Sequence, residues 1–146
     1  MILDWVKRKA AEVKQAKEMK RKALIEEQVR AIDEFNTEYF ANIKFPILIL
    51  SEDDYTAVSD LGEYYFDSDI QRCIGPSSEL LDSIGNRHTV EPNFETGKWV
   101  PKEKTGTLGC NELKKRLVPL LYMPRHKKDI DTKEDIREVI DLLLER

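Results

Sequence analysis

The first 43 residues contain neither glycine nor proline and are rich in residue types that favour helices. In the second half of this segment, apolar residues recur at intervals of three and four positions, as in a helix with one buried face. These residues are Ile25, Val29, Ile32, Phe35 and Tyr39. A thinner stripe precedes them and consists of Val6, Ala10, Val13 and Ala16. The pattern predicts one long helix, or two nearly continuous helices, over residues 1–43.

The two stripes are out of phase. When the later stripe is extended backwards by whole turns, it reaches Lys17, Arg21 and Lys22 rather than apolar residues. A straight helix of 40 residues would be about 60 Å long, whereas a compact domain of this chain length has a radius of gyration of about 15 Å. We therefore expect part of the segment to project, to bend, or to pack on another chain, while its second half packs on the globular domain.

The middle of the chain contains strand and turn signals. Residues 45–50 form a short branched run after a proline, which predicts a buried strand. Segments 79–84 and 87–91 flank Gly85-Asn86, and Gly97 separates two further short segments, so we expect an antiparallel meander of three or four strands. After Ser51–Asp54, both a short helix ending at Gly62 and an extended segment 55–58 fit the pattern. The aromatic run 64–66 suits a strand or the core side of a turn.

Two helices are predicted near the end of the chain. Asn111 is the expected cap of the first helix, which Pro119 limits because proline removes a backbone donor. Thr132 is the expected cap of the second helix, with Asp135 at the capping-box position and a full apolar stripe behind it. The predicted core comprises Val29, Ile32, Phe35, Ile47, Leu48, Ile49, Leu81, Val90, Leu113, Leu117, Ile136, Val139, Ile140 and Leu143. The predicted fold class is α+β, with a helical segment 1–43 and one α+β domain over 44–146.

Composition excludes several classes of protein. No apolar run approaches the roughly 20 residues that span a bilayer, so we expect no stable membrane insertion. The start of the chain lacks the pattern of a secretory signal, and two cysteines do not make a disulfide framework. These features favour a soluble cytoplasmic protein.

Charge is strongly segregated along the chain. Residues 1–24 contain eight Lys and Arg against three Asp and Glu, residues 25–96 contain four against sixteen, and residues 97–146 contain twelve against nine. Aromatic residues lie among the carboxylates of the middle segment, and this combination favours recognition of a basic protein partner. The residues that we expect at such a surface are Glu52, Asp53, Asp54, Tyr55, Glu63, Tyr64, Asp67 and Asp69. The simpler alternative is a solvated acidic face over core aromatics.

Three functional hypotheses follow from these patterns. The first is a non-enzymatic interaction module, such as a small inhibitor or immunity-type protein that masks a basic partner. The second is a structural protein that self-associates or docks through residues 1–24, which have apolar residues at the start and a basic remainder. The third is a small hydrolase or transferase that uses Cys110 with His88, or a group of acidic residues. A thiolate at Cys110 would be favoured by the amide groups at a helix start.

Other chemistry has little support in the sequence. The spacing of Cys73, His88, Cys110 and His126 matches no zinc pattern, so we expect no metal and no cofactor. Segment 104–109 is glycine-rich but lacks the ending of a nucleotide-binding loop. Basic runs 114–116 and 125–128 have no groove-reading motif around them, so nucleic acid is not the expected ligand.

Overall fold

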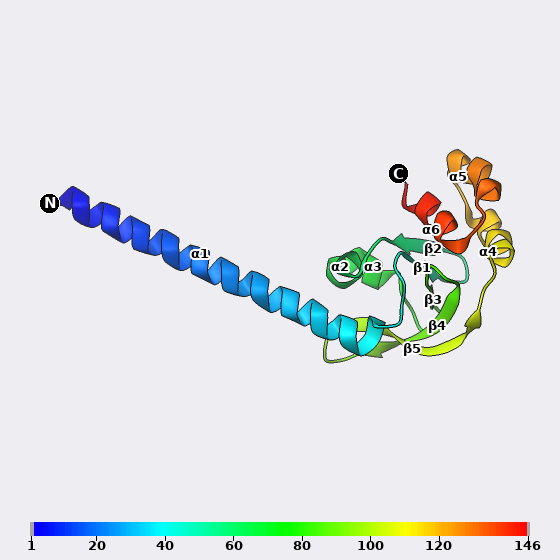
Figure 1. The fold of residues 1–146 in the computed structure, drawn as a ribbon, viewed down its shortest axis with the longest axis horizontal. Coiled ribbons are helices and arrows are strands. Elements are labelled where there is room, and N and C mark those ends of the chain that lie inside the picture. Colours follow the sequence, from blue (N-terminus) through cyan, green and yellow to red (C-terminus); the bar gives the residue numbers. More distant parts are fainter. Residues whose placement is uncertain (1, 146) are drawn as a thin grey trace. The chain divides into compact units, whose positions relative to one another are not determined.

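A computed structural model describes residues 2–145 of the chain, and Met1 and Arg146, the outer ends of the two predicted segments, lie outside the described residues. The chain divides into two compact units, residues 1–38 and residues 39–146. The fold class is α+β, as predicted: a long N-terminal helix, a five-stranded antiparallel sheet and C-terminal helices (Figure 1). No helix within residues 2–145 combines the length and the apolar character that crossing a membrane requires.

The first unit is a single unbroken helix, α1 (Ile2–Phe35), and a turn of π-helix, η1 (Asn36–Phe40), follows it. The sequence left open one helix or two, and the structure has one. At 1.5 Å per residue, α1 is about 51 Å long. Ion pairs between its own residues are few and exposed, with Lys9 to Glu12 at 3.5 Å and Arg30 to Glu34 at 4.0 Å.

The expectation that the later stripe of the N-terminal segment is buried is confirmed only for Phe35. Ile25 is 49% and Val29 53% exposed, and Ile32 and Tyr39 are only partly buried. A helical apolar stripe shows that one face is suited to burial, but it does not show what covers that face. The other predicted core residues are all buried.

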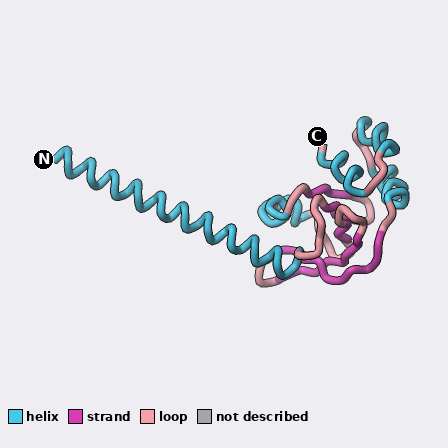
Figure 2. The backbone as a smooth tube through the Cα atoms, in the orientation of Figure 1, coloured by secondary structure: helices cyan, strands magenta, loops and turns pink. Residues whose placement is uncertain are grey.

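The second unit is built around a sheet in which every neighbouring pair of strands is antiparallel. Its strands are β1 (Ile47–Leu50), β2 (Tyr55–Val58), β3 (Glu79–Leu81), β4 (Asn86–Asn93) and β5 (Lys98–Thr107). Their order across the sheet is β2-β1-β3-β4-β5, so the predicted meander corresponds to β3, β4 and β5. Figure 2 shows these strands in magenta.

One face of the sheet packs against the C-terminal helices. Leu48 and Leu50 of β1 and Leu81 of β3 share a buried cluster with residues from two helices, α4 (Cys110–Leu117) and α6 (Ile136–Leu144). Because successive side chains of a strand point to opposite faces, Ile47 and Ile49 face the other way, and both are buried as well. The sheet is therefore covered on both sides at β1.

Two short helices, α2 (Leu61–Phe66) and α3 (Ser68–Arg72), follow β2. The aromatic run 64–66 is therefore helical, and the expectation of a strand or turn there is wrong. Asp60 starts α2 by accepting the backbone N–H of Glu63 at 2.8 Å, a capping signal that outweighs the strand preference of aromatic residues. Residues 55–58 are extended, which resolves the alternative left open by the sequence.

The C-terminal layer differs from the prediction at its helix starts. Gly109 rather than Asn111 precedes α4, and Asp135 rather than Thr132 caps α6, where it accepts the N–H of Glu138 at 2.8 Å. A helix that the sequence did not indicate, α5 (Pro124–Asp129), lies between single 3-10 turns η2 (Val118–Leu120) and η3 (Ile130–Thr132).

The connection between β3 and β4 is built around a buried carboxylate. Asp82 accepts the backbone N–H groups of Ile84 and Asn86 at 3.1 and 2.9 Å. Gly85 in this connection has φ +92°, and its carbonyl accepts the N–H of Leu108 at 2.8 Å. A Cβ on Gly85 would lie 2.7 Å from the Leu108 carbonyl oxygen, so this turn requires glycine for both conformation and space.

We expect Gly85→Ala to destabilise the protein by about 3 kcal/mol or more, because a positive φ and a backbone collision add together. Gly97→Ala is the matched control, since Gly97 also has a positive φ, +71°, but open space around it. That control should cost only about 1–2 kcal/mol. Urea unfolding of both variants measures the difference, and equal losses would contradict the role of the Leu108 contact.

Candidate functional site

The turn between β1 and β2 presents the first group of predicted surface residues. A hydrogen bond from the N–H of Ser51 to the Asp54 carbonyl at 2.9 Å closes this turn, and the Asp54 carboxylate accepts the N–H of Tyr55 at 2.7 Å. Glu52 and Asp53 are exposed, and neither makes an ion pair within the described part of the chain. Their charges are therefore directed to solvent.

The structure adds an aromatic residue to this turn that the sequence analysis did not include. Burial raises the pKa of Tyr55, and the nearby Tyr122 and Asp54 raise it further. Tyr122 is thus a neighbour of Tyr55, and its own side chain is 78% exposed. We call Glu52, Asp53, Asp54, Tyr55 and Tyr122 the acidic turn surface. Tyr122 follows Leu121, which packs in the same cluster as Tyr55 and Ala57 of β2. Because this proximity depends on tertiary packing, no local sequence signal indicated that Tyr122 lies near Tyr55.

The second group of predicted residues lies on α2 and α3, and most of its carboxylates have local partners. Glu63 accepts a hydrogen bond from the hydroxyl of Ser59. Asp67 is the N-cap of α3 and accepts the N–H groups of Asp69 and Ile70. Asp69 forms an ion pair with Arg72 at 3.3 Å. These carboxylates start and stabilise short helices, a role that their clustering in the sequence did not distinguish from recognition.

Tyr64 corrects the prediction, because it is completely buried and cannot contact a partner. Its hydroxyl donates to the Trp99 carbonyl, and its ring lies 4.9 Å from that of Phe40. Burial raises the pKa of Tyr64 strongly. The neighbouring Tyr65 and Phe66 are closer to the surface, and the Lys98 ammonium lies 4.3 Å from the Tyr65 ring.

The two groups of predicted residues do not form one surface. Residues 52–54 precede β2, whereas α2 begins after the other end of this strand. Four residues of extended chain separate the two groups by about 13 Å along the strand direction. The structure therefore brings Glu52, Asp53, Asp54 and Tyr55 together, and it places Glu63, Asp67 and Asp69 apart from them.

A different surface is found on α1, where large apolar side chains are exposed along the helix. Their exposure ranges from 48% to 83%, and they are Ile2, Leu3, Trp5, Val6, Val13, Met19, Leu24, Ile25 and Val29. At about 100° per residue, several apolar residues lie within about 40° of Leu24 around the helix axis. We call these residues, Ile2, Val6, Ala10, Val13, Leu24 and Ala31, the α1 stripe. Val29 lies about 140° away from Leu24.

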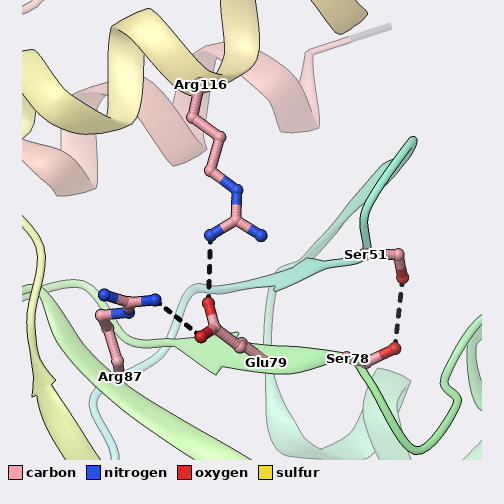
Figure 3. A network of polar contacts seen from close by, with 5 residues as sticks. All are labelled: Ser51, Ser78, Glu79, Arg87 and Arg116. Carbon is pink, nitrogen blue, oxygen red and sulfur yellow. Dashed lines mark hydrogen bonds and ion pairs between the residues drawn. The ribbon is translucent and has the colours of Figure 1, made fainter.

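A polar network joins the sheet to the helix layer, as Figure 3 shows. Glu79 of β3 accepts hydrogen bonds from Arg87 of β4 at 2.7 Å and from Arg116 of α4 at 3.0 Å. Burial by itself raises the pKa of Glu79, but the hydrogen bonds and charges of the two arginines outweigh it, so that the pKa is lowered overall from 4.5. Immediately before β3, the hydroxyls of Ser51 and Ser78 lie 3.2 Å apart.

The candidates for nucleophilic catalysis lie on different elements, Cys110 at the start of α4 and His88 in β4. Within residues 2–145, no hydrogen bond joins Cys110 to His88. Burial raises the pKa of the Cys110 thiol, as do Asp135 and Glu138, although Lys114 opposes them. The pKa of this thiol is thus shifted in the direction opposite to the one expected at a helix start. Burial also lowers the pKa of His88, whose Nε2 has no hydrogen-bond partner among residues 2–145.

Two further features complete the chemistry of the second unit. A surface pocket of about 700 Å³ lies where the starts of α4 and α6 meet the segment before β1, and Phe45, Ile84, Leu108 and Ile136 provide its apolar lining. In the described chain, residues 2–145, no three His, Cys, Asp or Glu side chains converge to hold a metal ion. Lys104 to Thr107 belong to β5, so the glycine-rich segment 104–109 is mostly strand rather than a phosphate-binding loop.

Comparison with known proteins supplies no family. No family model matches the chain, and neither the curated proteins nor the solved structures give a match.

We expect Glu79→Gln to lower the free energy of unfolding at pH 7 by about 1–3 kcal/mol, because two partly buried arginines lose their charged partner. Since the folded-state pKa of Glu79 lies below its ordinary value of 4.5, this contribution is complete above that pH. It is lost as the pH falls through the folded-state pKa. The difference between wild type and variant should therefore shrink below pH 4.5.

Urea unfolding between pH 3 and pH 8 measures this dependence. Glu91→Gln is the matched control, because the Glu91 carboxylate is half exposed and lies 3.9 Å from Lys102. That change should alter stability by less than about 0.5 kcal/mol. A pH-independent loss in Glu79→Gln would contradict an ionised Glu79 as the source.

Proposed function

We propose that the protein is a non-catalytic protein–protein interaction module and that α1 is its principal docking element. The observation behind this proposal is the set of large apolar side chains that lie exposed along α1. This proposal favours the hypothesis of a protein that self-associates or docks through its N-terminal helix over the hypothesis of a small inhibitor of a basic partner. The two free cysteines fit the reducing cytoplasm, which remains the proposed location.

The energetic argument concerns what such a helix lacks when it is alone. Isolated helices obtain little stability from propensity, and most helical stability in proteins comes from packing of an apolar face. Complete burial of a Val or Leu side chain stabilises by about 1.5–3 kcal/mol. Because Val6, Val13 and Leu24 are each about half exposed, their further burial against a partner is worth about 1 kcal/mol each. A docked α1 therefore gains stability that a free α1 does not have.

Photo-crosslinking in cells that express the protein tests whether α1 docks through its stripe. A photoreactive phenylalanine analogue in place of Val13 should give discrete crosslinked species, because Val13 lies on the α1 stripe. The same analogue in place of Val29 is the matched control, since both valines are 53% exposed but Val29 lies on the opposite side of the helix. If docking uses the α1 stripe, the analogue at Val29 should give about fivefold less crosslinked product than the analogue at Val13.

Equal yields from the two positions, or no product from either, would overturn the proposal. The mass of a crosslinked species also separates the occupants of the stripe, because a second copy of the chain doubles the mass of 17.0 kDa.

The second candidate function is recognition of a basic protein, in the manner of a small inhibitor or immunity-type protein. The observation that favours it is the acidic turn surface, where the exposed Glu52 and Asp53 precede the half-buried Tyr55 by two or three residues and the side chain of Tyr122 is 78% exposed. Aromatic side chains provide contact area, and charges of one sign attract the opposite sign and accelerate encounter. The proposed surface no longer includes Glu63, Tyr64, Asp67 and Asp69.

We expect the double change Glu52→Lys with Asp53→Lys to weaken binding of a lysine- and arginine-rich peptide by about fivefold at low ionic strength. The difference should disappear at high salt, where exposed charges are screened. The double change Glu95→Lys with Glu103→Lys alters net charge equally at other exposed positions and is the control. Fluorescence anisotropy measures both affinities, and equal weakening by the two double changes would assign the effect to net charge alone.

A further inference from the structure

The α1 stripe has a regular spacing along the helix. Ile2, Val13 and Leu24 are separated by eleven residues each, and Val6, Ala10 and Ala31 lie on the same face. Eleven residues correspond to slightly more than three turns, so the stripe drifts by only about 20° per repeat. A surface with this period runs nearly parallel to the helix axis, and a second straight helix can follow it along its length.

Charged residues flank the stripe in an ordered way. On one flank, between about 40° and 80° from Leu24, Lys9 and Lys20 are followed by Glu27 and Glu34. The other flank contains Lys14 and Arg21. The first flank therefore changes sign along the helix from basic to acidic, whereas the charged residues of the second flank within this sector are basic.

We propose that the occupant of the α1 stripe is the α1 helix of a second copy of this chain, packed in antiparallel orientation. The inference rests on the proposed function, because it names the partner of the docking element. A two-fold axis between antiparallel helices brings the same flank of both copies together. The basic half of the first flank then lies beside the acidic half of the same flank in the other copy.

Charge excludes the parallel arrangement. In a parallel pair each flank meets the opposite flank of the partner helix, so Lys9 and Lys20 would lie among Lys14 and Arg21. The arrangement would also place Lys17, which interrupts the stripe, against the same lysine of the other copy. Like charges in such contacts oppose association, whereas the antiparallel pair replaces them with opposite charges.

The register follows from the same residues. When Leu24 packs on Leu24 of the second copy, Lys20 of each helix lies opposite position 28 of the other helix, next to Glu27. The two copies therefore form two equivalent Lys20–Glu27 pairs. Lys17 then faces Ala31, a small residue over which its stem can extend towards solvent. In this register residues 13–35 of the two helices overlap, and Ile2, Val6 and Ala10 lie beyond the overlap, where Val6 and Ala10 line a shallow depression of about 510 Å³.

Charge exchange tests this arrangement in the full chain. Lys20→Glu or Glu27→Lys alone should raise the dimer dissociation constant about tenfold at low ionic strength, because each change converts two attractions into two repulsions. The double change Lys20→Glu with Glu27→Lys should restore the dissociation constant to within about twofold of wild type, since both pairs are re-formed with reversed sign. Lys20 and Glu27 are seven residues apart, so they are not neighbours within one helix.

The control uses the same pair of charge reversals on the opposite side of α1. Lys22 and Glu26 both lie about 160° from Leu24, so Lys22→Glu and Glu26→Lys should leave the dissociation constant within about twofold of wild type. Sedimentation equilibrium measures every variant, and circular dichroism confirms that each retains its helix content. All four positions are exposed, so the changes leave the α+β unit intact.

Each other outcome decides against the proposal in a distinguishable way. A wild-type chain that remains monomeric at 100 μM overturns the second copy as occupant, while crosslinking at Val13 still decides whether α1 docks at all. A dimer that is insensitive to Lys20→Glu and Glu27→Lys, or that the double change fails to restore, overturns the antiparallel arrangement. A dimer that the Lys22 and Glu26 changes weaken equally overturns the stripe as the contact surface.

Discussion

The α+β unit is organised by the burial of β1 on both of its faces. All four residues of this strand are buried: Leu48 and Leu50 pack with α4 and α6, and Ile47 and Ile49 face the opposite side of the sheet. Because β1 also pairs with β2 and β3 on its two edges, its backbone groups are satisfied within the sheet. The layers on either side therefore share one strand, and the remaining elements are positioned relative to it.

Sequence patterns predicted this unit well where local signals and burial agree. The branched residues of β1 correctly predicted a strand, and the apolar stripe of α6 correctly predicted a helix. Both predictions succeeded because burial of apolar side chains dominates the sequence of each segment. Helix starts were less accurate, since Asp135 and Thr132 are both good caps and only the structure shows that Asp135 accepts the Glu138 amide. The short helices α2 and α3 were missed because aromatic residues outweighed the capping signal of Asp60 in the pattern.

The candidate surfaces were harder to predict because they depend on where side chains lie rather than on residue type. A count of carboxylates gave the same weight to Asp53, which is directed to solvent, and to Asp67, which caps a helix. For a similar reason Tyr64 was predicted at the surface and Tyr122 was not, whereas the structure buries Tyr64 and exposes Tyr122. Nothing in the sequence distinguishes a buried tyrosine from an exposed one. Of the α1 stripe, the sequence analysis identified only Val6, Ala10 and Val13, because Leu24 belongs to neither of the two patterns, and the residues do not specify what covers them.

The pairing of β1 with β3 has a consequence for how the chain is assembled. Residues 51–78, which include β2, α2 and α3, connect β1 to β3, and the hydroxyls of Ser51 and Ser78 lie together where this connection begins and ends (Figure 3). The contacts of β3, β4 and β5 join neighbours in sequence, whereas closing the β1–β3 pair requires the ends of a long loop to meet, at an entropic cost that rises only slowly with loop length. Within this connection, the exposed turn 52–54 is the place where residues can be added at little cost, because β2 pairs with β1 and Tyr64 is buried.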